Sequence, residues 1–234
     1  MLSSAASLVS IQALFKKARG TLGEKTGETE QREALEAVSG ATRVLAERIR
    51  TGSAPVETLK EAQDIIERAS ALLKPHVQPG PYAQAVYTPG VGQTGLGVDP
   101  MEFFPFSPLI GRSNPIAPPV EFWVEDGVVH GRVTFGAVYC GAPDLVHGGV
   151  VASVMDELLG VTNVVNGRGA MTGTLTIRYL KPTPIFKEIR MEGYSKKQDG
   201  RKIYAEGRFF LEDELLVEAH GTFIAMRSAG PDEG

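Results

Sequence analysis

The spacing of apolar residues predicts helices in the first third of the chain. Leu8, Ile11, Leu14 and Phe15 recur at helical spacing, which predicts a short amphipathic helix within residues 1–23. Between residues 28 and 74, two further apolar stripes predict a helical hairpin. The first stripe comprises Leu35, Val38, Leu45 and Ile49, and the second comprises Val56, Leu59, Ile66 and Leu73. Ser53 and Pro55 signal the start of the second helix, and Pro75 ends it. We therefore assign residues 1–74 to a helical N-terminal extension.

The segment 75–119 is rich in proline and glycine, which disfavour regular elements, so we predict a linker or a segment that wraps the next domain. Its aromatic residues Phe103, Phe104 and Phe106 indicate that part of it packs onto a core. The stretch GVGQTG at residues 90–95 matches the glycine pattern of dinucleotide sites. That pattern needs a strand before it and a helix after it, whereas Pro89 precedes and Asp99-Pro100 follows. We interpret the match as chance.

From Val120 onward, apolar and polar residues alternate as they do in β-strands. The stretch VEFWVEDGVVHGRVTF predicts two strands joined by a hairpin turn at Asp126-Gly127. A helix follows in LVHGGVVASVMDELLG, and four more strands follow the helix, in MTGTLTIRYL, KEIRMEGYS, RKIYAEGRFFL and LLVEAHGTFIAM. Short turns between consecutive strands favour antiparallel pairing. The pattern therefore predicts an α+β domain over residues 120–228, with an antiparallel sheet and one long helix.

The predicted helix begins at about Gly148, directly after His147, and most of its surface is apolar. Gly149, Ser153, Asp156 and Gly160 fall together on the opposite side, at 100° per residue. This face is narrow and centred on a carboxylate. It is either a solvated face that carries no chemistry or a face that holds a reacting group.

The beginning of this helix is a candidate donor site. The first backbone N–H groups of a helix lack an intrahelical partner and carry partial positive charge, so Gly148 and Gly149 can present a donor to an oxyanion such as a polarised acyl carbonyl. Gly148 and Asp156 are eight residues apart, about 12 Å along the helix axis, so they cannot act on one carbonyl within one subunit. If both act, a homodimer must form the site, with two equivalent sites per dimer.

These motifs resemble those of a known family. HGGVVASVMDELLG followed by MTGTLTIRYLKPTP is similar to the hotdog-fold acyl-CoA thioesterases of the PaaI-like branch. These enzymes carry HGG, an acid nine residues after the His, and a later T-x-x-L-x-[IV]-x-Y-x-x-P strand. The resemblance covers about residues 120–227. It implies a hotdog fold, in which the sheet wraps the helix and two subunits join across it, with acyl-CoA as substrate, no cofactor, and a homodimer or a dimer of dimers.

The resemblance also implies roles for individual residues. Asp156 would be the nucleophile or general base, the Gly148 N–H would polarise the thioester carbonyl, and Thr172 would orient Asp156 or a water molecule. His147 would position the helix turn or contact the ligand. One departure concerns the stretch before His147, where some relatives place an Asn or Gln that holds the carbonyl. Here that stretch reads YCGAPDLVHGG, and Gly141 supplies no side chain. Either the backbone alone forms the oxyanion site or the activity is weak.

Further residues are candidates for substrate binding. Gly149 and Ser153 share the helix face of Asp156 and would lie beside the substrate. Four basic residues near strand ends or turns, Arg178, Lys181, Arg201 and Lys202, are candidates for a cradle around the phosphates of coenzyme A. The alternative is that these four are solvated charges at the sheet edges.

Composition excludes several classes of protein. The net charge of −4, with no basic stripe, argues against nucleic-acid binding. No apolar run approaches the roughly 20 residues of a membrane span. The single cysteine, Cys140, and the histidine spacing indicate a reducing compartment, which we take to be the cytoplasm, and no structural metal. The acid-free, serine-rich first 23 residues slightly resemble a transit peptide, but the amphipathic helix is the preferred interpretation.

Two other catalytic arrangements are less well supported. A nucleophilic triad of Cys140, His147 and Asp156 lacks any signature around the cysteine, which favours an inert thiol. Asp156 and Glu157 point about 100° apart, so they cannot share a proton, and we expect Glu157 to be a packing or surface residue. The preferred hypothesis is acyl-CoA thioester hydrolysis. The alternatives are an acyl-CoA-binding or scaffolding protein and, with less support, a hotdog enoyl-CoA hydratase or dehydratase.

Overall fold

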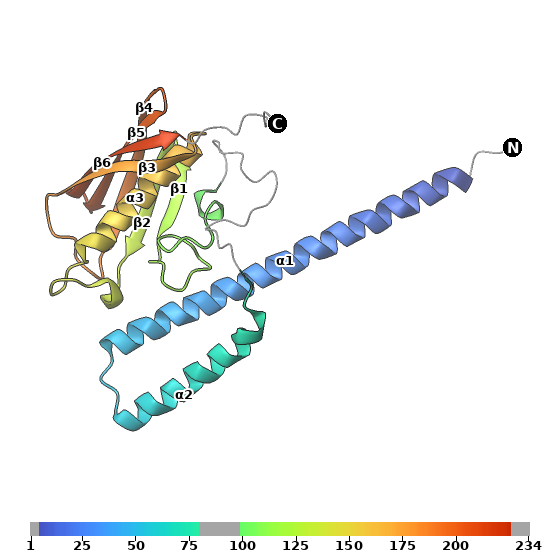
Figure 1. The fold of residues 1–234 in the computed structure, drawn as a ribbon, viewed down its shortest axis with the longest axis horizontal. Coiled ribbons are helices and arrows are strands. Elements are labelled where there is room, and N and C mark those ends of the chain that lie inside the picture. Colours follow the sequence, from blue (N-terminus) through green and yellow to red (C-terminus); the bar gives the residue numbers. More distant parts are fainter. Residues whose placement is uncertain (1–4, 80–98, 226–234) are drawn as a thin grey trace.

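The computed structural model describes residues 5–79 and 99–225 of the chain (Figure 1). Its helices and short 3₁₀ turns are α1 (Ala5–Thr51), α2 (Val56–Leu73), η1 (Lys74–His76), η2 (Pro100–Glu102), η3 (Ala137–Tyr139) and α3 (Gly148–Val165). Its strands are β1 (Glu121–Glu125), β2 (Val128–Thr134), β3 (Ala170–Tyr179), β4 (Glu188–Asp199), β5 (Lys202–Leu211) and β6 (Glu214–Ala225). The glycine motif at residues 90–95 and the predicted domain end at residues 226–228 lie outside these ranges.

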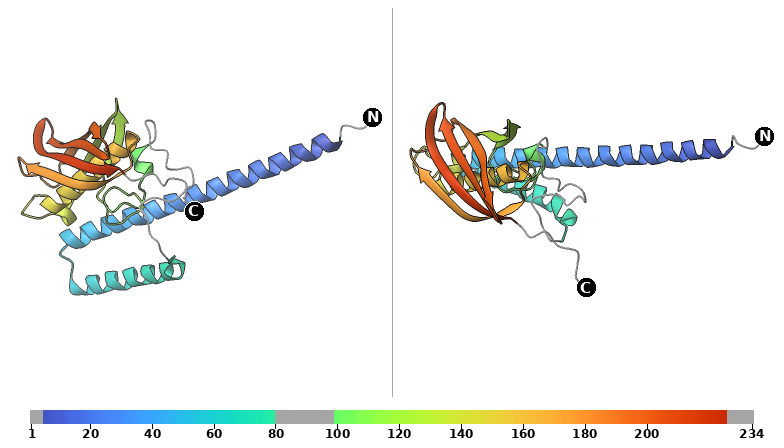
Figure 2. Two further views of the ribbon diagram at one scale, coloured as in Figure 1. Left: turned by 45° about the horizontal axis from the view of Figure 1, so that its top comes forward. Right: turned by 90° about the horizontal axis from the view of Figure 1, so that it is seen from above.

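The six strands form one antiparallel sheet in the order β1-β2-β4-β5-β6-β3. Figure 2 shows that the sheet curves around α3, which lies along its concave face. The turn between β1 and β2 contains Asp126 at φ 49° and Gly127 at φ 77°, the left-handed backbone that a tight hairpin turn requires. The predicted α+β domain, its strand order along the chain and this hairpin are confirmed, and the arrangement is that of a hotdog fold.

Two glycines let α3 lie close to the sheet. A Cβ atom on Gly193 of β4 would come within 2.2 Å of Thr162 Oγ1, and one on Gly207 of β5 within 2.5 Å of Met155 Sδ. The helix fills the gap with buried apolar side chains, among them Val151, Val154, Met155, Leu158 and Leu159. Because this face is packed against rigid strands, the opposite face of α3 has a fixed position and orientation.

The N-terminal helices differ from the prediction. One continuous helix, α1, replaces the short helix and the separate first helix of the hairpin. Glycines at positions 20, 23 and 27 each cost a helix about 1 kcal/mol, but none stops it as proline would. The apolar stripes also remain largely exposed: Val38 is 50% exposed, Ile49 is 62% exposed, and α2 buries no residue. The predicted start of α2 holds, with Pro55 rather than Ser53 at its N-cap.

Residues 99–120, which precede β1, wrap the domain and are called the wrapping segment below. Met101 and Ile110 are buried in the core, and Phe103 and Phe104 pack partly buried against it. Phe106 is 36% exposed, so the predicted packing is confirmed for the first two phenylalanines and is weaker for the third.

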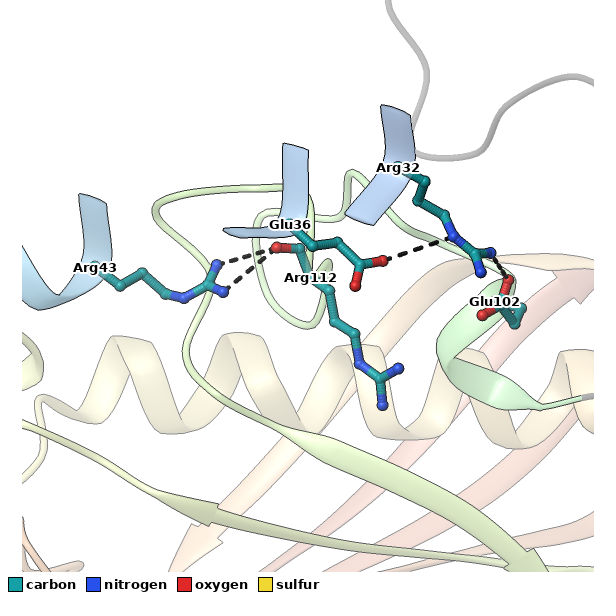
Figure 3. Close-up of polar contacts among 5 residues, drawn as sticks. All are labelled: Arg32, Glu36, Arg43, Glu102 and Arg112. Atoms are coloured by element: carbon teal, nitrogen blue, oxygen red, sulfur yellow. Dashed lines mark hydrogen bonds and ion pairs between the residues drawn. The ribbon is translucent and has the colours of Figure 1, made fainter. Parts of the chain in front are cut away.

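Helix α1 docks on this wrapping segment through polar groups rather than through its apolar stripe. Arg32 forms an ion pair with Glu102 at 2.6 Å, and Arg43 donates to the carbonyl oxygen of Arg112 (Figure 3). Arg43 also donates to the carbonyl oxygen of Asn114 at 2.7 Å. The buried Ser39 hydroxyl donates to the carbonyl oxygen of Ser113 at 2.9 Å. These contacts align α1 beside the domain and leave Leu35, Val38, Val44 and Ile49 exposed.

Helix α3 has enough length and apolar character to cross a membrane, with a mean hydropathy of 1.3 over Gly148–Val165. Half of this stretch is buried inside the protein. The apolar composition of α3 is therefore explained by its packing against the sheet.

Candidate active site

The first turn of α3 is fixed by His147. Its ring Nδ1 accepts a hydrogen bond from the Gly149 N–H at 3.0 Å, and its carbonyl oxygen accepts from the N–H groups of Val150 and Val151. Within the described parts of the chain, the N–H of Gly148 donates to no acceptor, and Gly148 is exposed. The helix therefore begins where the sequence predicts and presents one free donor.

A cavity of about 600 Å³ lies at this end of α3. The Tyr179 hydroxyl, from the end of β3, donates to the carbonyl oxygen of Gly148 at 2.8 Å. This bond anchors the glycine while its own N–H stays available. The cavity is lined by Gly141, Ala142, Leu145, Val146, His147, Gly148, Val151, Tyr179, Leu180, Lys181, Pro182 and Thr183.

Asp156 lies two turns further along α3, on its half-exposed face. The Thr172 hydroxyl of β3 donates to Asp156 Oδ1 at 2.9 Å. Ser153, one turn earlier, donates its hydroxyl to the carbonyl oxygen of Gly149 at 2.8 Å. A Cβ atom on Gly160, one turn later, would meet no atom within 4 Å. The carboxylate is thus held by one neighbour on a face that is otherwise small and open.

Replacing Thr172 by Val would remove the hydroxyl while keeping the shape of the side chain. A hydrogen bond to a charged group contributes about 1.5–3 kcal/mol, so under the hypothesis of thioester hydrolysis we expect kcat to fall by about tenfold or more while KM changes little. Steady-state kinetics would measure this effect. Thr172→Ser is the matched control, because it keeps the donor and should keep most of the activity. Equal rates for the Val and Ser variants would remove Thr172 from the reaction.

Glu157, beside Asp156, has a structural partner that the sequence does not reveal. The buried Ser107 hydroxyl of the wrapping segment donates to Glu157 Oε1 at 2.8 Å. Burial raises the pKa of the Glu157 carboxyl above its ordinary value, the Ser107 hydrogen bond opposes this rise, and the charge of Asp156 adds to it. Glu157 is therefore a packing residue that joins α3 to the wrapping segment, one of the two roles expected for it.

The raised pKa of Glu157 predicts a pH-dependent stability. The folded protein keeps this proton to a higher pH than the unfolded chain, whose glutamates titrate near about 4.3. The contribution of the Glu157 carboxyl to the free energy of unfolding is therefore fully present at low pH, and it is lost as the pH rises through the pKa of the folded state. We expect Glu157→Gln, which can still accept from Ser107, to have a higher Tm than wild type at pH 8 and no such advantage at pH 4. Thermal unfolding at both pH values tests this, and an unchanged pH profile would contradict it.

The four basic residues do not form one cluster within the chain. Arg178 pairs with Glu218 at 2.5 Å, and Lys181 pairs with Glu214. Arg201 donates to the carbonyl oxygen of Ala225 at 3.1 Å. Strand β6 pairs with both β3 and β5. Arg178 of β3 lies opposite Glu218 of β6, and Lys202 of β5 lies opposite Ile224 of β6. Glu218 and Ile224 are about 20 Å apart along β6. The two pairs therefore lie at opposite ends of the sheet, one near Gly148 and the other near Asp156.

The residues of the alternative triad are not assembled. The Cys140 thiol donates to the carbonyl oxygen of Ala142 at 3.2 Å, the ring of His147 accepts from Gly149, and Asp156 accepts from Thr172. Nine residues of helix separate His147 from Asp156, about 13 Å. The cysteine is therefore not activated by this histidine and aspartate.

Gly141, which stands where some relatives carry an amide side chain, is constrained by the backbone. A Cβ atom at this position would lie 2.8 Å from the Cα atom of His147. No Asn or Gln fits there without moving the start of α3. The departure from the family pattern thus has a steric cause, and backbone N–H groups remain as the donors at this end.

The fold and these motifs define the class of protein. Residues 144–218, which contain α3 and most of the sheet, match the family model of the thioesterase superfamily. Acyl-coenzyme A thioesterase THEM4 of Mus musculus is 33% identical over 93 residues, 39% of this chain and 40% of that protein. THEM4 of Bos taurus is 33% identical over 88 residues, 37% of this chain and 36% of that protein. The chain thus spans about two fifths of the length of these curated relatives.

One solved structure resembles more of the chain. The crystal structure of protein RHA08564, a thioesterase superfamily protein, superposes with a TM-score of 0.67 and 29% sequence identity. The superposition covers 81% of this chain and 94% of that one. The superposition covers more residues of this chain than the sheet and α3 contain together. The structural likeness therefore extends into the residues before β1.

Proposed function

We propose that this protein hydrolyses acyl-CoA thioesters to a carboxylic acid and coenzyme A. The observation that carries the proposal is the half-exposed Asp156 carboxylate, held by Thr172 at 2.9 Å on an otherwise small, open helix face. The superfamily of residues 144–218 and the names of the curated relatives support the same chemistry. We further propose that the enzyme works in the cytoplasm.

In the proposed reaction, Asp156 acts on the thioester carbonyl carbon, either directly as a nucleophile or by taking a proton from an attacking water molecule. The carbonyl oxygen gains negative charge as the new bond forms, and a Gly148 N–H donates to it. The C–S bond then breaks, and coenzyme A leaves as a thiolate that takes up a proton. On the nucleophilic path the acyl group is left on Asp156 as a mixed anhydride, and water hydrolyses it to the acid and the free carboxylate. On the general-base path the attacking water molecule enters the acid directly. On either path one water molecule supplies the oxygen of the acid and the proton of the thiol.

We propose that two copies of the chain build each site. Gly148 and Asp156 on one helix are about 12 Å apart, so the donor of one protomer must meet the carboxylate of the other. Strand β3 carries Thr172 and ends the sheet, so its outer edge is available for a second copy. The same pairing would bring Lys181, near Gly148, toward Arg201 and Lys202 of the other protomer, near Asp156. The basic residues that lie apart in one protomer would then surround one coenzyme A.

Release of coenzyme A from a panel of acyl-CoAs, followed with a chromogenic thiol reagent, tests the activity. Turnover of at least one member supports hydrolysis. Saturable binding of the panel without thiol release would favour the binding or scaffolding protein. Loss of enoyl-CoA absorbance without thiol release would favour a hydratase.

A further inference from the structure

The end of α1 reaches the loop that precedes the candidate catalytic helix. Glu47 Oε1 accepts a hydrogen bond from the N–H of Ala137 at 2.8 Å, and Oε2 accepts from the N–H of Val138 at 3.2 Å. These are the first N–H groups of η3, 90 residues further along the chain. Gly136 makes room for the carboxylate, because a Cβ atom there would lie 2.5 Å from Glu47 Oε2. The side chain of Glu47 therefore holds the start of this loop.

The same loop also holds the start of α3. The N–H of His147 donates to the carbonyl oxygen of Tyr139 at 2.8 Å, and Cys140 pairs with Val146 in an antiparallel bridge. Between them, the N–H of Gly141 donates to the carbonyl oxygen of Leu145 at 2.8 Å. Residues 136–147 thus form a closed hairpin. One end receives the Glu47 carboxylate, and the other end is the N-cap residue that precedes the Gly148 donor.

Glu47 differs from the other residues with which α1 docks. Arg32, Ser39 and Arg43 contact residues 102–114 of the wrapping segment, whereas Glu47 contacts the hairpin of residues 136–147 that leads into α3. Its two bonds are charge-assisted, which makes them stronger than bonds between neutral groups. They are also directional, so they fix where the loop lies as well as whether α1 stays docked.

We propose that Glu47 is a positioning residue for thioester hydrolysis and that, through it, the N-terminal helix sets the position of the Gly148 N–H. The proposal rests on the proposed function of this site. An oxyanion donor acts on charge that develops in the transition state, so a small displacement of the donor lowers kcat more than it weakens substrate binding. Helix α1 is therefore part of the catalytic unit rather than an appendage.

Glu47→Ala removes both bonds and tests the proposal in the full-length chain. We expect kcat to fall by about tenfold, with KM within about twofold of wild type, which corresponds to the loss of roughly one hydrogen bond in the transition state. Glu47→Gln keeps one acceptor oxygen and should show a smaller loss, and it serves in place of the alanine variant should that variant fail to fold. Backbone amide exchange in residues 137–149 should become faster in both variants.

Two matched variants separate positioning from general effects. Glu33→Ala removes an exposed carboxylate from the same helix and should leave kcat and exchange unchanged. Ser39→Ala removes the buried hydrogen bond to the carbonyl oxygen of Ser113, which docks α1 on the wrapping segment away from residues 136–147. It should lower Tm and leave kcat close to wild type. The proposal is overturned if Glu47→Ala matches Glu33→Ala in kcat and in exchange, or if Ser39→Ala lowers kcat as much as Glu47→Ala does. Absence of thiol release by the wild-type protein would instead overturn the proposed function, and the exchange measurement would still report whether Glu47 orders the loop.

Discussion

Asp156→Asn is expected to lower kcat by about 10²- to 10⁴-fold while the protein stays folded. The amide has nearly the shape of the carboxylate and can still accept from the Thr172 hydroxyl, so the packing of α3 should be preserved. It can neither attack a thioester carbonyl effectively nor take a proton from water. Thiol release under saturating acyl-CoA would measure kcat, and thermal unfolding of the same preparation would show whether the variant stays folded.

The neighbouring carboxylate provides the control for Asp156. Glu157→Gln makes the same chemical change one residue away, but its side chain faces Ser107 rather than the open helix face. We expect this variant to retain thiol release close to wild type. Turnover by Asp156→Asn at the rate of Glu157→Gln would show that Asp156 takes no part in the chemistry.

Gly148→Pro is expected to lower kcat by about 10²- to 10³-fold, the effect of deleting one oxyanion donor. Proline removes the backbone N–H, yet it is favoured at the first position of a helix. It also requires an extended residue before it, and His147 already has φ −60° and ψ 130°. The substitution should therefore delete one donor without displacing the helix, so Tm should change little. Steady-state kinetics and thermal unfolding would test both statements.

Gly148→Ala is the matched control, because alanine keeps the N–H and its Cβ atom would lie 3.8 Å from the Tyr179 hydroxyl, an ordinary contact. It should lose much less activity than the proline variant. Mixing the Gly148→Pro and Asp156→Asn proteins tests the shared site. A mixed dimer has one site with both changes and one with neither, so activity should reappear on subunit exchange. No recovery in dimers shown to have exchanged would argue that each site lies within one chain.

The sequence was most informative where structure depends on neighbouring residues. The start of α3 at Gly148 follows from His147 and the glycine pair, which fix local backbone geometry. The hairpin at Asp126-Gly127 needs two residues with positive φ, which is also a local requirement. Helical spacing likewise placed Asp156 on the face opposite the buried side of α3.

Contacts between distant segments could not be predicted in this way. No pattern marks Ser107 as the partner of Glu157, because 50 residues separate them and either side chain alone could face solvent. The bonds from Glu47 to Ala137 and Val138 join segments 90 residues apart and depend on where α1 docks. The apolar stripes predicted a helical hairpin but not how it packs, and in the structure polar groups dock α1 while α2 buries no residue.

The sequence by itself therefore determined the strands and the central helix of the second half of this protein, the fold class of that half, and the residues that are candidates for its chemistry. It did so because hydrophobic periodicity, turn residues and helix capping all act over a few residues. Only the tertiary structure decided that the Thr172 hydroxyl donates to Asp156 rather than to water alone, that the basic residues lie at opposite ends of the sheet, and that Glu47 reaches the loop before α3. Those facts depend on packing that brings distant segments together, and no local preference specifies which surfaces meet.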